Sequence, residues 1–112
     1  MFRITLNRVH DRILIKEGDE NLALKVDCDA RMIVTKIRQA NELIVKANKE
    51  GASEFEKEFA TRQFSEAIFG QEQTEKLMEF YNNDYSCVIT VCGMYFEKRL
   101  SKKISAAQKK LK

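Results

Sequence analysis

The spacing of apolar residues changes once along the chain, and this change constrains the fold more than any other feature of the sequence. Over roughly the first quarter, apolar and polar residues alternate, as they do in strands with one buried face. From about Asp29 onwards, apolar residues recur every three or four positions, which is the spacing of amphipathic helices. The sequence therefore predicts an α+β fold that is mostly helical, with a small N-terminal antiparallel sheet packed on about four helices.

Three short segments are predicted as strands, at residues 2–6, 12–16 and 22–26. Their apolar side chains are Phe2, Ile4, Leu6, Ile13, Leu14, Ile15, Leu22, Leu24 and Val26. Residues 7–11 are predicted to form the turn between the first two strands, and the polar residues 17–21 separate the second strand from the third. Because an isolated hairpin is marginal in water, we expect this sheet to lie on the helices.

The first helix is predicted from Asp29, whose side chain can cap it, to about Lys49, with Gly51 ending it. Its core-facing residues are Ile33, Ile37, Ala40, Ile44 and Ala47, widened by Val34 and Leu43. Its polar face carries Arg31, Thr35, Glu42 and Lys46. This pattern is typical of a helix that packs one side on a core.

The second helix is predicted to start at Ser53, which forms a capping-box pattern with Glu56, and to end at Phe69. Gly70 can then adopt the left-handed cap conformation. The apolar residues of this helix form two groups on nearly opposite sides: Ala60, Phe64, Ala67 and Ile68 on one, and Phe55, Phe59 and Phe69 on the other. Two interpretations stay open, a central helix covered on both faces or a phenylalanine face that meets another chain.

Two further helices are predicted, one at residues 71–81 and one from Tyr85 towards the C-terminus, with a break at 82–84. Residues 87–96 are apolar nearly all round, so we expect them to be buried. Beyond Glu97 the helix becomes amphipathic, and its apolar stripe is Phe96, Leu100, Ile104, Ala107 and Leu111. Because two or three turns of helix are marginal in water, this end is expected to fray until a partner binds it.

The chain is expected to form a single domain, with a β-rich part at residues 1–27, a helical core at 28–97 and a basic helix end at 98–112. Its 44% hydrophobic and 33% charged residues are typical neither of a disordered chain nor of a membrane protein. No apolar run approaches the roughly 18 residues of a bilayer span, and no signal-peptide block is present at the N-terminus. We therefore expect a soluble cytoplasmic protein without membrane binding.

Catalytic and metal-binding chemistry has little support in the sequence. The three cysteines, Cys28, Cys87 and Cys92, are an odd number without a C-x-x-C pair, and His10 has no carboxylate or cysteine at ligand spacing. Carboxylate pairs lie in polar surroundings with nothing to raise a pKa, and the chain has no glycine-rich phosphate motif. We expect no enzyme activity, no cofactor and no metal.

Charge is unevenly distributed along the chain. Residues 98–112 hold seven basic residues and no acidic one, whereas the rest of the chain has 13 basic and 17 acidic residues. The basic tail fits binding to an apolar or acidic partner segment, and it also fits a small nucleic-acid-binding protein or regulator. The tail lacks interleaved aromatic residues and the body is acidic, which disfavours the nucleic-acid alternative.

The segment QFSEAIFGQEQTEKL, residues 63–77, resembles the tail assembly chaperones of long-tailed phages and prophages. Chains of that family show a helix that ends in an apolar residue and Phe-Gly, then a small acidic helix with a Glu-Lys pair, a polar break and an apolar helix. The resemblance covers about residues 55–100, with a looser match at the helix start VDCDARMIVTKI. The match lies in the pattern and is weak in any one residue, and the family has no invariant catalytic signature.

The resemblance implies a non-enzymatic protein of the bacterial host cytoplasm that is absent from the mature virion. Such chaperones bind the tape measure protein and keep it soluble until the tail tube protein polymerises around it. Many are also made in a longer form by ribosomal frameshifting. Homo-oligomerisation is left open, and nucleic acid is not an expected partner.

We expect partner binding to use exposed apolar helical surface. The residues assigned to it are Phe55, Phe59, Phe96, Leu100 and Ile104. Lys102 and Lys103 are expected to steer an acidic partner towards this surface, an effect that weakens as salt rises.

Overall fold

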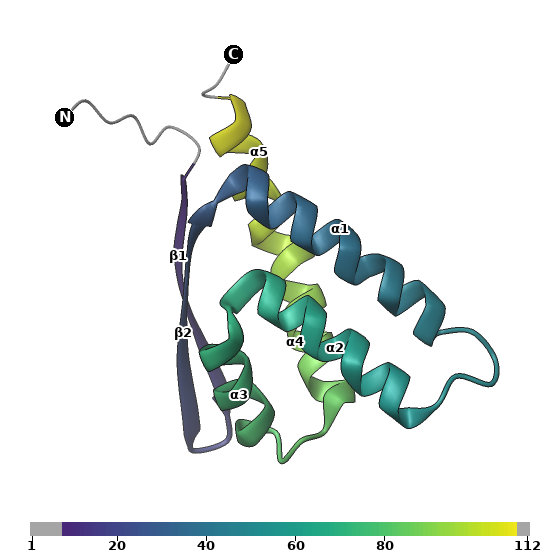
Figure 1. Cartoon of the computed structure of the whole chain (residues 1–112). Coiled ribbons are helices and arrows are strands. Elements are labelled where there is room, and N and C mark those ends of the chain that lie inside the picture. Colours follow the sequence, from purple (N-terminus) through teal and green to yellow (C-terminus); the bar gives the residue numbers. More distant parts are fainter. Residues whose placement is uncertain (1–7, 110–112) are drawn as a thin grey trace.

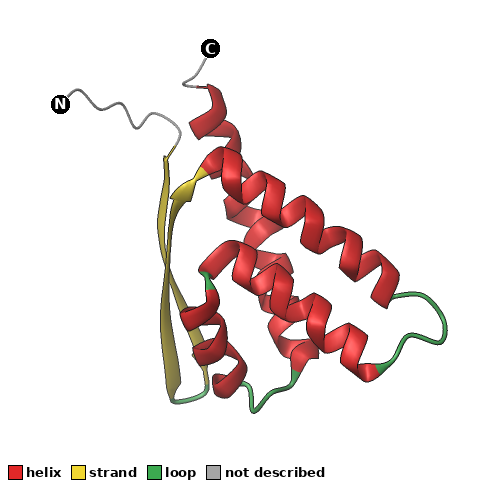
Figure 2. Cartoon of the chain, viewed as in Figure 1, coloured by secondary structure: helices red, strands yellow, loops and turns green. Residues whose placement is uncertain are grey.

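The computed structural model describes residues 8–109, a hairpin followed by a run of helices (Figures 1 and 2). In chain order the elements are β1 (Arg8–Glu17), β2 (Glu20–Asp29), α1 (Ala30–Ala47), α2 (Glu54–Phe69), α3 (Gln71–Phe80), α4 (Tyr85–Tyr95), the π-helical turn η1 (Phe96–Leu100) and α5 (Ser101–Lys109). The predicted α+β class, mostly helical with a small N-terminal antiparallel sheet, is confirmed.

The hairpin pairs β1 with β2 in antiparallel register, from Arg8 opposite Asp29 to Glu17 opposite Glu20. Gly18, with a φ of 60°, begins the tight turn between the strands. The predicted strands at 12–16 and 22–26 lie within β1 and β2. The turn predicted at 7–11 is wrong for residues 8–11, which are paired strand, and the strand predicted at 2–6 lies outside the described residues.

One face of the hairpin packs on the helices, as Figure 1 shows along one side of the helical layer. Odd positions of β1 and even positions of β2 point inward, and the most buried of them are Val9, Ile15, Leu24 and Val26. The opposite face is exposed, and it includes Leu14 at 56%. The alternation therefore places one side of the sheet in the core and one in solvent.

The first two helices begin at the predicted caps. The Asp29 side chain accepts a hydrogen bond from the Arg31 backbone N–H at 2.8 Å, and the Ser53 hydroxyl accepts one from the Glu56 N–H at 3.1 Å. Helix α1 ends at Ala47, two residues earlier than predicted. Its inner face is buried as expected, at Ala30, Ile33, Ile37, Ala40 and Ala47.

Gly70 joins α2 to α3 through a backbone conformation that other residues rarely adopt. Its φ is 83° and its ψ is 169°, so the positive φ is as predicted but the left-handed helical ψ is not. The Gly70 N–H donates to the carbonyl of Glu66, and the Gly70 carbonyl accepts from the Thr74 N–H. One residue therefore ends α2 and begins α3. The break predicted at 82–84 is also present, where Asn82 and Asn83 both have positive φ.

The segments α4, η1 and α5 follow one another without interruption, with a single π turn that sequence reasoning did not foresee. Buried positions recur at Val88, Cys92 and Tyr95, and then at Leu100, Ile104 and Ala107. Tyr95 and Leu100 are five positions apart, because the π turn contains one residue more than an α-helical turn. This extra residue keeps both side chains on the inner face.

Two expectations for this last helical segment are wrong. Residues 87–96 are not buried all round, because Met94 is 51% exposed and Thr90 is exposed. The terminal helix end is not free of the rest of the chain over residues 101–108, since α5 packs on α1 and β1. The reason is that Leu100, Ile104 and Ala107, between 0% and 6% exposed, belong to the core of the chain itself. Leu111 lies outside the described residues.

Candidate protein-interaction surface

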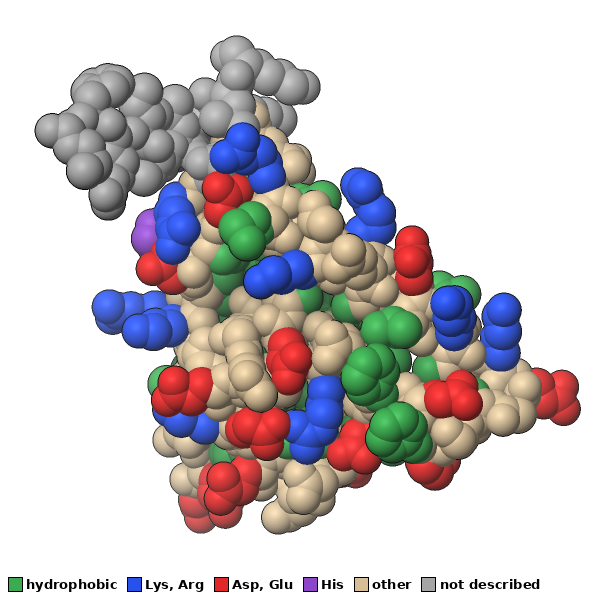
Figure 3. Space-filling view, viewed as in Figure 1, with side chains coloured by type: hydrophobic (Ala, Val, Ile, Leu, Met, Phe, Trp, Pro, Cys, Tyr) green, Lys and Arg blue, Asp and Glu red, His purple; other side chains and the backbone are tan. Residues whose placement is uncertain are grey.

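Two phenylalanines at the start of α2 form the most exposed aromatic surface in the described part of the chain. Phe55 is 74% exposed and Phe59 is 45% exposed. Their rings stack with centroids 6.3 Å apart and planes 14° apart, because residues four apart share a helix face. We call these two side chains the phenylalanine pair. Figure 3 shows hydrophobic side chains gathered over the α1–α2 side of the molecule, with acidic and basic side chains around them.

The third phenylalanine predicted for this face, Phe69, is not part of the surface. It is 6% exposed and stacks on Tyr95, with centroids 5.9 Å apart. The Gln73 side chain fixes this end of α2, donating hydrogen bonds to the carbonyls of Lys25 and Phe69 at 2.7 and 2.8 Å. The second face of α2 is therefore covered at its C-terminal end by β2 and α3 and open at its N-terminal end.

The structure separates the other predicted partner-binding residues from the phenylalanine pair. Leu100 is 0% exposed and Ile104 is 6% exposed, so the prediction that these two side chains belong to an exposed surface is wrong. They serve the core, because α5 packs on α1 and β1 and covers them. Phe96 is half-buried and meets Phe64 edge-to-face, with centroids 6.3 Å apart.

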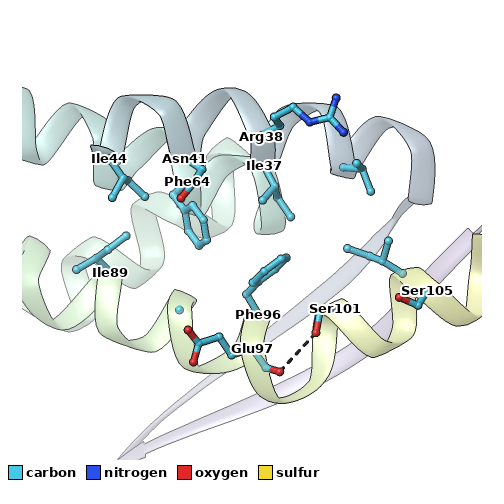
Figure 4. Close-up of a pocket in the computed structure, with 13 residues that line it drawn as sticks. Ile37, Arg38, Asn41, Ile44, Phe64, Ile89, Phe96, Glu97, Ser101 and Ser105 are labelled. Atoms are coloured by element: carbon cyan, nitrogen blue, oxygen red, sulfur yellow. Dashed lines mark hydrogen bonds between the residues drawn. The ribbon is translucent and has the colours of Figure 1, made fainter. Parts of the chain in front are cut away.

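Phe96 lines an apolar groove of about 600 Å³ between α1 and the α4–η1–α5 segment, which we call the α1–α4 groove (Figure 4). Its main apolar lining residues are Val34, Ile37, Ile44, Phe64, Ile89 and Phe96. Figure 4 shows the rings of Phe64 and Phe96 between the two walls, with Ile44 and Ile89 facing each other at one end. Phe64 comes from α2, which forms the floor.

The walls of the groove carry one charge of each sign. Arg38 lies on the α1 wall and Glu97 on the η1 wall, and neither forms an ion pair with the side chains described for residues 8–108. Figure 4 shows the Arg38 guanidinium directed out of the groove towards solvent. Gly93 also lines the groove, and a Cβ atom built there would have nothing within 4 Å.

The basic tail is tied to the hairpin through Asp11. Arg99 donates to both carboxylate oxygens of Asp11, at 2.6 and 2.7 Å, and the Tyr95 hydroxyl donates at 2.8 Å. Lys103 lies 4.0 Å from the same carboxylate, whose side chain is 4% exposed. Lys102 is exposed and Lys103 is partly exposed. Of the two predicted steering lysines, the structure therefore brings Lys103 to Asp11 and leaves Lys102 at the surface.

Burial and hydrogen bonding act in opposite directions on the Asp11 carboxylate. Burial alone would raise its pKa, but the hydrogen bonds from Arg99, Tyr95 and the Arg12 backbone outweigh that effect and hold the pKa below its ordinary value. Asp11 is therefore ionised near neutral pH and forms a charged anchor between β1 and the C-terminal helix.

Two further side chains, Cys92 and Tyr81, are held in their neutral forms. Burial raises the pKa of the Cys92 thiol to about 12, and burial with the hydrogen bond to Glu17 raises that of Tyr81 to about 12. Both groups stay protonated at neutral pH, so neither is prepared to act as a base or nucleophile there. Among residues 8–109, no three histidine, cysteine or acidic side chains are grouped so that they could hold a metal ion.

Comparisons with models of known protein families, with curated proteins and with solved structures give no match to the chain. In the part that the structure describes, none of the helices combines the length and the apolar character needed to cross a membrane.

Proposed function

We propose that the chain is a non-enzymatic tail assembly chaperone of a long-tailed phage or prophage, and that it binds the tape measure protein and keeps it soluble. The observation that carries the proposal is the phenylalanine pair, two large apolar side chains held side by side in solvent. Contiguous exposed apolar surface of this kind is typical of sites that bind another protein. The resemblance of residues 63–77 to that family supports the choice of partner.

A small apolar surface is sufficient for a chaperone of this kind. A long helical protein with exposed apolar stripes aggregates before assembly, so its stripes must be covered reversibly. Burial of a phenylalanine side chain contributes about 1.5–3 kcal/mol before the costs of association. Several copies along one client, each binding weakly, would then keep the client soluble and still be displaced by the tail tube protein.

The same resemblance supports a proposed location for the chain and a proposed contact with the tail tube protein. It would work in the bacterial cytoplasm, would contact the tail tube protein when the tube replaces it, and would be absent from the finished virion. Lys102, which is exposed, would supply electrostatic steering towards acidic segments of the client.

The contacts of Asp11 count against the nucleic-acid alternative. Arg99 and Lys103 are two of the basic residues of the tail, and both lie against the Asp11 carboxylate. Their charges are partly neutralised within the chain, which leaves a smaller basic surface for phosphate groups. A gel-shift titration should accordingly show no binding of duplex DNA at about 50 mM salt, where phosphate contacts are strong.

Co-expression with the tape measure protein of the same phage tests the proposal. The wild-type chain should keep the tape measure protein in the soluble fraction and co-purify with it, whereas the double variant Phe55→Ser/Phe59→Ser should do neither. The matched control is Met32→Ser, which removes another exposed apolar side chain, 59% exposed, from a different helix. Retention of the client by a normally helical Phe55→Ser/Phe59→Ser protein would refute the proposal.

A further inference from the structure

We propose that a groove on the outer face of the hairpin binds an acidic peptide segment of a partner protein, one that carries an aliphatic side chain between its carboxylates. The groove, which we call the hairpin groove, has a volume of about 510 Å³ and is lined by residues of β1, β2 and α3. The inference does not rest on the proposed function, because the phenylalanine pair lies on α2. The exposed side chains that line the groove are Arg12, Leu14, Ala23, Lys25 and Lys76.

Three of these side chains are cations, and no acidic residue is among the described lining residues. Neither Arg12 nor Lys25 forms an ion pair with the side chains described for residues 8–108. Lys76 approaches Glu72 at 3.9 Å, and the Glu72 side chain is 88% exposed. Exposed pairs of this kind contribute little, so all three positive charges can interact with an anionic partner.

Arg12 and Lys25 are directly opposite each other in the register of the hairpin. The Lys25 N–H donates to the Gln73 side-chain oxygen at 2.8 Å, and the Lys25 carbonyl accepts from the Gln73 amide at 2.7 Å, so both backbone groups of Lys25 point away from β1. The pair is therefore of the type without backbone hydrogen bonds, in which the Cα atoms lie only about 4.5 Å apart. Like charges at such positions destabilise a sheet, and an anion between them would relieve the repulsion.

The next pair on the same face shows the opposite arrangement of charge. His10 lies opposite Asp27, with its Nδ1 atom 3.2 Å from the carboxylate, and Arg8 also binds Asp27 at 3.0 Å. The basic side chains at that end of the hairpin therefore have an acidic partner within the chain. The contrast favours an external partner for the positive charges at Arg12 and Lys25.

Gln73 holds the third cation beside the sheet. Besides its two bonds to Lys25, its side-chain amide donates to the Phe69 carbonyl at 2.8 Å, so one side chain connects β2, the end of α2 and α3. Lys76 follows three residues later and lies on the same side of α3. The backbone that carries Lys76 is thus fixed relative to Lys25, and a site arranged before binding loses less freedom when a ligand binds.

The apolar part of the hairpin groove selects the class of ligand. Leu14 is 56% exposed and lies opposite Ala23, so an aliphatic surface is present between the cations. An aliphatic side chain of a partner can cover Leu14 while the carboxylates beside it reach the three cations. Proteins that bind single-stranded nucleic acid supply aromatic rings on which bases stack, and no described lining residue is aromatic. The lining therefore favours an acidic peptide over a nucleic acid.

The small size of the hairpin groove predicts a weak contact. A peptide segment that fills it buries much less than the roughly 1,200 Å² of stable complexes. A short peptide should accordingly half-saturate the chain at about 0.1–1 mM. Because the charges are exposed, binding should weaken as the salt concentration rises.

Titration of the isotope-labelled chain with the acetylated synthetic peptide Glu-Glu-Leu-Glu-Glu, followed by NMR of the backbone amides, tests the proposal. At about 50 mM salt, shifts should be largest at Leu14, Ala23, Lys25 and Lys76 and should half-saturate below about 1 mM. The matched probe Glu-Glu-Ser-Glu-Glu keeps the charge and loses the aliphatic side chain. It should bind at least about fivefold more weakly.

The variant Arg12→Glu separates a binding role from a structural one. It places opposite charges across the hairpin, so the temperature of unfolding should rise while the affinity for the peptide falls at least about tenfold. Lys25→Gln, which removes one cation without adding an anion, should also lower the affinity. Lys49→Glu is the control, because it makes the same change of net charge in the α1–α2 connection, which lies away from the hairpin in Figure 1. Its affinity should stay within about twofold of the wild type.

Three outcomes would overturn the proposal. The first is that amide shifts are absent or lie away from the hairpin groove, and the second is that Arg12→Glu binds the peptide at wild-type strength. The third is that an oligodeoxythymidine shifts the same amides at lower concentration than the peptide does, which would assign the groove to nucleic acid.

This inference and the proposed function can fail separately. Phe55→Ser/Phe59→Ser leaves the hairpin groove intact, so this variant should bind the peptide with wild-type affinity whatever its effect on the tape measure protein. Loss of peptide binding in a correctly folded Phe55→Ser/Phe59→Ser protein would contradict the assignment of the peptide to the hairpin groove.

Discussion

The Asp11 carboxylate joins the first strand to the last helical segment through three side chains, and its position shows how one residue can organise distant parts of a chain. Arg99 binds it through two nitrogens and Tyr95 through its hydroxyl, 88 and 84 residues away. Hydrogen bonds to a charged group are stronger than those between neutral groups, and this group is 4% exposed. Asp11 is therefore a structural anchor.

Replacement of Asp11 by asparagine should destabilise the fold. The amide keeps the size of the side chain but loses the charge that Arg99 and Lys103 face. We expect the free energy of unfolding to fall by about 1.5–3 kcal/mol, the range for hydrogen bonds to charged groups. Urea denaturation followed by circular dichroism measures this difference, and an unchanged midpoint and slope would show that the anchor contributes nothing.

The acid sensitivity of the fold should depend on the same residue. The folded-state pKa of Asp11 lies below its unfolded-state value of about 3.9, so the unfolded chain takes up the proton first as pH falls. The contribution of Asp11 is complete above about pH 5 and is lost as pH falls through the folded-state pKa. Unfolding free energies measured between pH 3 and 6, roughly the range in which carboxylates titrate, should therefore fall less steeply for Asp11→Asn than for the wild type.

At the scale of elements, two glycines illustrate opposite uses of the same residue. Gly70 has a backbone conformation that is nearly restricted to glycine, whereas Gly93 lies within the regular helix α4. A Cβ atom at either position would meet no neighbour within 4 Å. The two sites therefore differ in backbone conformation and not in available space.

Alanine at these two positions should change stability in opposite directions. Gly70→Ala is expected to lower the free energy of unfolding by about 1–3 kcal/mol, because alanine is strained at that φ and ψ. Gly93→Ala is expected to raise it by about 0.5–1 kcal/mol through helix propensity. Thermal unfolding of both variants beside the wild type checks the prediction, and a shift of the same sign in both would contradict it.

The C-terminal helical segment contains the element that could not be predicted from the sequence, the π turn η1. Caps at Asp29 and Ser53 and the glycine after α2 could be read locally, because each depends on neighbouring residues. The π turn could not, since it lies between Tyr95 and Leu100, whose burial depends on contacts with distant parts of the chain. The turn predicted at 7–11 was wrong for a related reason: residues 8–11 contain polar residues typical of turns, yet they pair with 26–29.

Leu100 provides a direct check that the last helical segment belongs to the core. Its side chain is 0% exposed, so Leu100→Ala should lower the free energy of unfolding by about 2–5 kcal/mol through the cavity that it leaves. Phe55→Ser, at a side chain that is 74% exposed, should change it by no more than about 0.5 kcal/mol. Chemical denaturation compares the two, and equal losses would place both residues in the same environment.

At the scale of the whole molecule, the residues predicted to bind a partner divide into exposed and buried side chains. The two-sided apolar pattern of α2 pointed to Phe55 and Phe59, which the structure leaves in solvent. The same reasoning failed for Leu100 and Ile104, because an apolar stripe looks alike whether it meets another chain or its own core. The α1–α4 groove had no signal in the sequence, since it depends on how three helices pack.

The central claim is that the phenylalanine pair binds an apolar segment of another protein. Calorimetric titration of a helical segment of the tape measure protein into the chain, repeated at several temperatures and at concentrations where the chain is monomeric, tests it most directly. Burial of apolar surface gives a negative heat-capacity change on binding. We predict that change for the wild type, with an affinity at least about tenfold lower and a smaller heat-capacity change for Phe55→Ser/Phe59→Ser. Equal affinity and an equal heat-capacity change in a correctly folded double variant would contradict the claim.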